Sequence, residues 1–175
     1  MKKTSAMLAI GLAGLLAVPA AVAQTKQADR ESQKFISSAI QGDIAEIEVG
    51  KLAEEKGQSD DVKQFGAMLV KDHSDHKAKA ERVANELGVR VPTVSSFGAK
   101  ATYTKLKMLS GASFDHSFAK AMVKDHQEDI NEFRKESSKT DAAGQLAKET
   151  LPVLEKHLQT AQSLQRQTAQ KQSSR

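Results

Sequence analysis

Apolar residues recur every three or four positions through most of this chain and mark out four long segments. The segments run from about residue 31 to 56, from 59 to 87, from 113 to 137 and from 140 to 165. Such a stripe is typical of an amphipathic helix that packs one face against its neighbours. The pattern therefore predicts an all-α fold made of four long helices.

The connections between the segments predict how the helices are arranged. About three residues join the first helix to the second and the third to the fourth, so each pair should form an antiparallel hairpin. The stretch 88–112 between the pairs is longer, and it contains Pro92 and an apolar group around Tyr103 that indicates a short helix. A crossover of this length lets the third helix run parallel to the second. We therefore expect a ferritin-like four-helix bundle over residues 24–165.

Two features of the sequence modify the prediction for the last helix. Pro152 lacks a backbone N–H and should bend the helix that contains it. After residue 165 the apolar stripe ends and the composition turns to Gln, Ser, Lys and Arg. The sequence therefore predicts a disordered tail over residues 166–175.

The chain also repeats itself. Residues 59–65 return in similar form 81 positions later, and the same offset places His76 opposite His157. An offset of 79 pairs Glu46 in the first helix with Asp125 in the third. Repeats of this kind predict two similar helical hairpins related by a pseudo-twofold rotation.

The amino terminus has the pattern of a secretory signal peptide. Residues 1–3 are basic, residues 7–18 are apolar, and the small residues of 21–23 form a cleavage signal before Gln24. The apolar run is too short to span a bilayer, and the chain has no cysteine that could carry a lipid. We therefore expect residues 1–23 to be removed and the mature protein to be periplasmic or secreted, with no membrane span.

Charge and composition exclude several kinds of partner and reaction. The formal net charge is +4, and removal of Lys2 and Lys3 with the leader leaves 24 basic residues against 22 acidic ones. This weak excess, with one Tyr and no Trp, argues against binding to nucleic acid. A Gly-rich phosphate loop and a nucleophile elbow are also missing from the sequence. These features favour a non-catalytic protein.

Four segments resemble a known family of bacterial proteins. They are residues 42–53, residues 65–73, residues 122–126 with the run Met-Val-Lys-Asp-His, and residues 150–158. In combination they resemble a bacterial family of secreted proteins of unknown function whose members are often described as putative outer membrane proteins. The resemblance covers nearly all of the mature chain. It implies a ferritin-like fold and an envelope location, and it implies no activity.

The repeat brings together a set of candidate metal ligands. Glu46 and Asp125 would supply carboxylates, and His76 and His157 would supply imidazoles. Ferritin-like di-iron sites also need a Glu three residues before each His, but those positions hold His73 and Leu154 here. Asp72, one turn before His76, could substitute in one hairpin, whereas Val153 stands at the equivalent place in the other. A mononuclear zinc, copper or iron site is therefore easier to build than a di-iron centre.

A second repeat adds two histidines to the candidates. The run Val-Lys-Asp-His occurs at 70–73 and at 123–126, which places His73 and His126 on the second and third helices. His73 and His76 have the i, i+3 spacing of a chelating pair, as do His126 and Asp129. The alternative is that each histidine bonds a carboxylate on a facing helix and has a structural role.

Two classes of function remain open from the sequence. The first is a non-catalytic envelope protein that acts in stress or binds a protein partner through its surface. The second is a metal-binding periplasmic protein with a mononuclear or di-iron-like site and redox activity. The incomplete ligand pattern favours the first class, and the inward histidines and carboxylates keep the second open.

Overall fold

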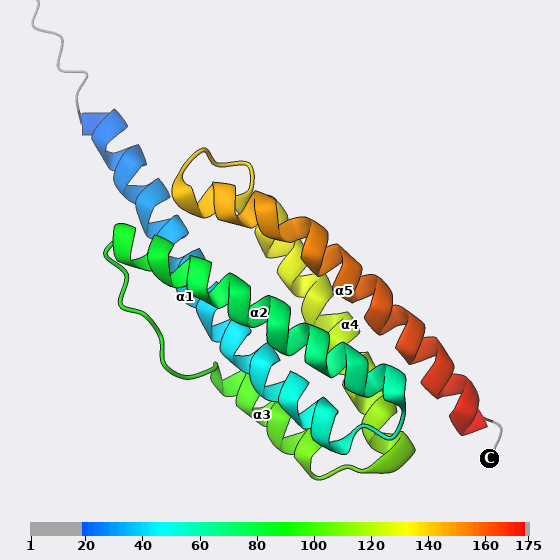
Figure 1. The fold of residues 1–175 in the computed structure, drawn as a ribbon. Helices are drawn as coiled ribbons and strands as arrows, with labels where there is room; N and C mark the ends of the chain where they lie inside the picture. Colours follow the sequence, from blue (N-terminus) through cyan, green and yellow to red (C-terminus); the bar gives the residue numbers. More distant parts are fainter. Residues whose placement is uncertain (1–18, 174–175) are drawn as a thin grey trace, which may run out of the picture.

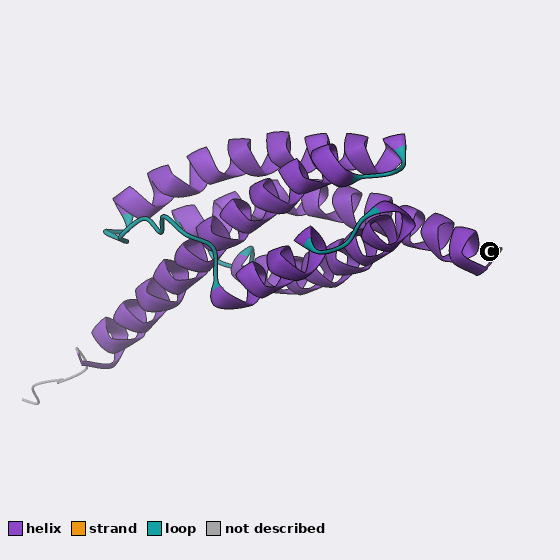
Figure 2. Ribbon diagram, turned by 90° about the horizontal axis from the view of Figure 1, so that it is seen from below, coloured by secondary structure: helices purple, strands orange, loops and turns teal. Residues whose placement is uncertain are grey.

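The computed structural model describes the backbone of residues 19–173 and the side chains of residues 30–171. The helices are α1 (Pro19–Lys56), α2 (Asp60–Glu86), α3 (Phe97–Lys107), α4 (Gly111–Glu136) and α5 (Ala142–Ser173). Loops alone connect these helices, and the described residues contain no strand (Figure 2). The expected all-α helical bundle is therefore confirmed. Among the described residues, none of the helices has the length and apolar character needed to cross a membrane.

The helices form two hairpins, α1–α2 and α4–α5, that pack side by side (Figure 1). The segment after α2 returns along the bundle, includes α3 on the outside, and ends where α4 begins (Figure 1). A hydrogen-bonded contact fixes this topology: the carboxylate of Asp115, near the start of α4, accepts bonds from the backbone N–H groups of Gln58 and Ser59 at 2.8 and 3.0 Å. Because α2 and α4 begin at the same end of the bundle, they run parallel.

Local chemistry explains where the second helix starts. Ser59 adopts an extended backbone, and its hydroxyl accepts a hydrogen bond from the N–H of Val62 at 3.4 Å. Asp60 and Asp61 occupy the first turn, where their negative charges interact favourably with the helix dipole. At the other end, Gly88 has φ of +66°, a left-handed conformation that glycine adopts without a steric penalty.

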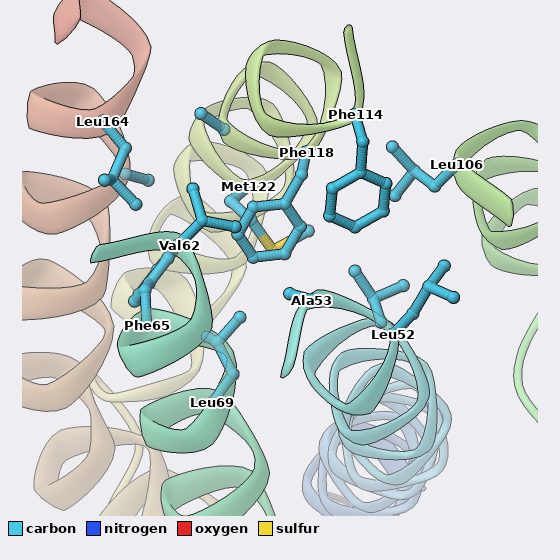
Figure 3. Packing of buried hydrophobic residues seen from close by; sticks show 13 residues of the cluster. Leu52, Ala53, Val62, Phe65, Leu69, Leu106, Phe114, Phe118, Met122 and Leu164 are labelled. Atoms are coloured by element: carbon cyan, nitrogen blue, oxygen red, sulfur yellow. The ribbon is translucent and has the colours of Figure 1, made fainter. Parts of the chain in front are cut away.

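The apolar core consists of two clusters, one toward each end of the bundle. The first contains residues from all of the helices, and Figure 3 shows side chains such as Leu52, Val62, Leu106, Phe114 and Leu164 converging on its centre. The second lies toward the ends of α2 and α4 and the start of α5. Its buried members are Phe35, Ile36, Ala39, Ile40, Ala80, Ala84, Ile130, Phe133, Ala143, Leu146, Ala147 and Leu154.

Helices α1 and α2 approach each other closely at a pair of glycines. A Cβ atom added to Gly66 would lie 2.6 Å from the carbonyl oxygen of Gly50 and 2.9 Å from the Cβ of Ala53. A Cβ added to Gly50 would lie 2.8 Å from the carbonyl oxygen of Gly66. The two backbones therefore touch directly, and a larger side chain at either position would have to push the helices apart.

The structure differs from the sequence expectations at several places. Helix α5 continues to Ser173, so residues 166–173 are helical where a disordered tail was expected, and Thr168 is buried. Val153, expected on the inward stripe of α5, is exposed. His116, expected from its place near the start of the third helix to face solvent, is partly buried, with its Nδ1 3.3 Å from the hydroxyl of Thr168. The apolar run 7–18 of the predicted leader lies outside the described residues.

We expect Gly66→Ala to lower the free energy of unfolding by about 1–3 kcal/mol, because the added methyl group meets backbone atoms of α1 that cannot move independently. Gly42→Ala is the matched control, since no atom lies within 4 Å of its added Cβ. That control should raise the free energy of unfolding by about 0.5–1 kcal/mol through helix propensity. Urea unfolding of both variants measures the difference, and equal values for the two would contradict the close contact.

Candidate metal centre

Polar and ionisable side chains are buried in the middle of the bundle, between the two apolar clusters. Each long helix has a buried polar residue one turn away from a residue of the first apolar cluster. These residues are Glu46 before Val49, His73 after Leu69, His126 after Met122 and His157 before Ala161. Each long helix thus contributes one such residue to the same level of the bundle. Asp43 and His76, one turn further along α1 and α2, are also buried.

Three of these side chains converge. One ring nitrogen from each of His73, His126 and His157 lies within 4.8 Å of the other two, and all three residues are buried. The ring centroids are 5.3–5.8 Å apart. Among the described residues, no other group of three His, Asp or Glu side chains brings its ligand atoms so close together. The ligands come from α2, α4 and α5, so both hairpins contribute.

The hydrogen bond of His126 determines which of its nitrogens faces the cluster. Its Nδ1 lies 2.9 Å from the backbone carbonyl oxygen of Met122. Because a carbonyl oxygen can only accept, Nδ1 must carry the proton and donate it. In a neutral imidazole the other nitrogen, Nε2, then holds a free lone pair. That Nε2 points at His157.

The other two histidines are held in the same manner by carboxylates. His157 is fully buried, and its Nε2 lies 3.0 Å from Oδ2 of Asp72. His73 places its Nδ1 3.0 Å from Oδ1 of Asp43. Carboxylate oxygens accept hydrogen bonds, so each of these nitrogens donates, and in a neutral imidazole the opposite ring nitrogen carries the lone pair. The Nε2 of His73 is buried and has no hydrogen-bond partner.

The cluster therefore turns the unprotonated nitrogens of His126 and His157 toward each other, and a ring nitrogen of His73 lies within 4.8 Å of the other two residues' ligand atoms. Nε2 of His126 and Nδ1 of His157 are 3.3 Å apart. If both rings are neutral and both outer nitrogens donate, neither inner nitrogen has a proton to share with the other. Two facing lone pairs repel, so the arrangement is stabilised by either an added proton or a cation. Donation of the outer N–H to a carboxylate or a backbone carbonyl is the usual environment of metal-ligating histidines.

The electrostatic environment favours the neutral, ligand-competent imidazoles. Burial, reinforced by His73 and His157, lowers the pKa of His126 to about 3. Burial also lowers the pKa of His157, although its hydrogen bond to Asp72 opposes this effect. Partial burial raises the pKa of Asp72, but the hydrogen bonds from His157 and Lys71 outweigh it and hold the pKa below its usual range. Asp72 is therefore an ionised acceptor.

Carboxyl groups border the cluster on the side of α1 and α4. Burial raises the pKa of Glu46 well above its usual range, and the charges of Asp129, Asp125 and Asp43 add to the effect. Oε2 of Glu46 is buried without a partner. Burial and the neighbouring Asp125 raise the pKa of Asp129 to about 7. Burial likewise raises the pKa of Asp125. These carboxyl groups therefore hold their protons to a higher pH than exposed carboxyl groups do.

The structure distributes the candidates from the sequence among three places. His73, His126 and His157 form the cluster, and Asp72 bonds His157 from outside it. His76 points inward as expected, but its Nδ1 bonds Asp43, at 2.8 and 2.9 Å from the two carboxylate oxygens. The expected bond from His76 or His157 to Glu46 or Asp125 is absent among the described contacts.

Asp43 is the residue that the sequence reasoning missed. It is 2% exposed and holds both His73 and His76 by their Nδ1 atoms. A signal was available, because Asp43 stands three residues before Glu46 and so shares its helix face. The helical spacing alone did not single it out, since the same face also contains apolar residues.

A solved structure has a fold similar to that of this chain. The crystal structure of a DUF305 fragment from Deinococcus radiodurans superposes with a TM-score of 0.70, at 12% sequence identity, over 78% of this chain and 96% of that one. At this identity the match shows a shared helical fold alone. No curated protein matches the sequence. The model of the domain of unknown function DUF4142 matches residues 17–164. The chain therefore belongs to the DUF4142 family.

Proposed function

We propose that this protein binds one divalent transition-metal ion through His73, His126 and His157. The observation that supports the proposal is the convergence of three buried imidazoles, each of which donates an N–H group to an acceptor outside the cluster. A purely structural histidine network would alternate donors and acceptors so that each inner nitrogen had a partner. Here the inner nitrogen of His73 has no hydrogen-bond partner, and the other two face each other.

The spacing of the cluster suits a tetrahedral ion. Nitrogens held about 2.05 Å from a tetrahedral centre are about 3.3 Å apart, which is the separation of Nε2 of His126 and Nδ1 of His157. A ring nitrogen of His73 lies within 4.8 Å of the ligand atoms of the other two histidines. His73 would move inward to bind the same ion. Three neutral imidazoles favour zinc or copper, and they also suit iron. The fourth position would be available to water or to another ligand.

The second part of the proposal concerns fold and location. We infer a ferritin-like bundle in the bacterial envelope. Two antiparallel hairpins joined by a crossover that contains α3 support the ferritin-like arrangement. The basic start, the apolar run 7–18 and the small residues of 21–23 support export. Redox activity would require an ion that changes oxidation state, so copper or iron at the site would permit it and zinc would not.

One observation favours the other class of function, a surface that binds a protein partner. Phe97 is 90% exposed and Met108 is 83% exposed, at the two ends of α3, and Val94 precedes them on the crossover with 53% exposure. Large apolar side chains in this position are available for contact with another protein. The two functions are compatible because α3 lies outside the bundle and the histidines lie within it.

We expect the purified protein, stripped of metal and given Zn²⁺ or Cu²⁺, to bind about one ion per chain. His126→Gln and His157→Gln should each weaken binding by about a hundredfold, because a three-ligand chelate loses one donor. His116→Gln is the matched control, since His116 lies on α4 outside the cluster. Dialysis followed by metal analysis measures the stoichiometry, and circular dichroism confirms helicity. Failure of the unmodified protein to bind, or equal binding by all variants, would reject the site.

The acidic side of the centre predicts a pH dependence of stability. An unfolded Asp has a pKa of about 3.9, whereas folded Asp129 has a pKa of about 7, so the folded state binds more protons between these values. The contribution of Asp129 to stability is therefore present below about pH 4 and is lost as the pH rises to about 7. In the metal-free protein, Asp129→Asn should gain stability relative to the unmodified chain at pH 8 but not at pH 4. Urea unfolding at both values tests this, and a gain independent of pH would contradict it.

We expect export to remove the leader after Ala23, because small residues at Ala21 and Ala23 follow the apolar run. Mass spectrometry of protein isolated from the native envelope should find Gln24, or its cyclised form, at the amino terminus. A mature chain that retains residues 7–18 would contradict both the cleavage and the proposed location.

A further inference from the structure

Two hollows in the protein meet at His76. A surface groove of about 180 Å³ is lined by Asp72, Asp75, His76, Lys79, Glu149, Thr150 and Val153. A smaller cavity of about 30 Å³ also has His76 and Thr150 in its wall, together with Asp43, His73, Asp129 and Leu154, and its lining includes the exposed Ser38 and Glu132. His76 and Thr150 thus lie between the groove and the smaller cavity. The smaller cavity reaches His73, a member of the histidine cluster.

Between the groove and the cavity, His76 has a ring nitrogen that is available to bind a metal ion. Its Nδ1 is held by the carboxylate of Asp43, so Nε2 is the nitrogen that remains. The residue is only 8% exposed, and Nε2 is buried with no hydrogen-bond partner. A buried polar atom without a hydrogen-bond partner is destabilising, so a ligand bound to this atom would remove that penalty.

The groove in front of His76 is acidic. Asp72, Asp75 and Glu149 line it, Lys79 stands in its wall beside Glu149, and Lys71 forms ion pairs with Asp72 and Asp75, so three carboxylates face two ammonium groups. A hollow lined by an excess of one charge concentrates ions of the opposite charge and raises their association rate. The groove should therefore collect cations directly in front of His76.

We propose that His76 is a transit ligand that takes a divalent metal ion from the acidic groove and passes it to His73. This inference rests on the proposed metal site. Asp43 orients the rings for this step, because it bonds Nδ1 of both His73 and His76. Nε2 of each ring is then left to bind the metal ion. A cavity of about 30 Å³ has room for one ion or one water molecule between them. Each exchange replaces one nitrogen ligand with another and needs no change in oxidation state.

The role of a transit ligand has a distinct kinetic signature. A residue that binds the ion only on its way in changes the association and dissociation rates by the same factor and leaves the equilibrium constant unchanged. A residue of the final site changes the equilibrium constant, and a residue that only fills space changes neither. The three roles can therefore be separated in one set of measurements.

The experiment mixes the metal-free, full-length mature protein with Zn²⁺ or Co²⁺ in a stopped-flow instrument and measures association and dissociation. His76→Gln should slow both rates by about tenfold, equivalent to about 1.4 kcal/mol in the barrier. The stoichiometry and Kd should match those of the unmodified protein, and His116→Gln should load at the normal rate. Normal loading by His76→Gln would overturn the inference, as would a raised Kd, which would place His76 in the final site.

A second variant tests the route without touching the core. Asp75 and Glu149 both have side chains that are 67% exposed, so the double substitution Asp75→Asn with Glu149→Gln carries little risk to folding. It should slow association by about tenfold at low ionic strength and by much less at high salt. The two single substitutions are measured beside the double one, and Glu128→Gln, whose side chain is 61% exposed on α4, is the charge-matched control for each of them. Equal rates for the groove variant and the control would exclude the groove as the route.

The outcomes also separate this inference from the function on which it rests. If the unmodified protein binds no metal, the proposed site fails and the transit role fails with it. If the unmodified protein binds metal and both the His76 and the groove variants load normally, the site stands and the transit role alone is rejected.

Discussion

The need to pair buried imidazoles governs the middle of this bundle. Each histidine there requires a hydrogen-bond acceptor for its N–H, because a buried polar atom without a partner is costly. The structure meets this need from three different sources: a neighbouring helix supplies Asp43 for His73, another supplies Asp72 for His157, and the backbone of α4 itself supplies Met122 for His126. These bonds fix the orientation of the rings, and in that orientation a nitrogen of each ring lies within 4.8 Å of the other two.

The rest of the fold holds this polar level in place. Apolar clusters on both sides pack the four long helices and exclude water from the histidines. At one end Asp115 bonds the turn between α1 and α2, and at the other the hydroxyl of Ser32 donates to Glu136 at 2.8 Å. The direct backbone contact at Gly50 and Gly66 sets the distance between α1 and α2. These contacts together fix the position of each helix along the bundle axis. The height of each histidine in the bundle depends on those positions.

The sequence predicts the helices well and the centre only in part. The apolar stripes, the Ser59 cap and the short links give the two hairpins and the crossover, because these are local or periodic signals. The internal offset paired His76 with His157, whereas the structure brings His73 to the level of His157. His73 and His76 stand on nearly the same face, one turn apart, so the periodicity cannot tell which of them is level with a residue on another helix. That depends on how far α2 is shifted along α5, which the packing of the whole core decides.

The division of the three histidines between the hairpins has a consequence for assembly. His73 belongs to the first hairpin, His126 and His157 belong to the second, and the segment 87–110 is the covalent connection between them. An ion bound to all three would act as a cross-link between parts of the chain that are 53 residues apart, in the way that a disulfide does in proteins that contain cysteine. A chain without cysteine would then have a reversible cross-link between its two halves, in addition to the covalent connection through α3.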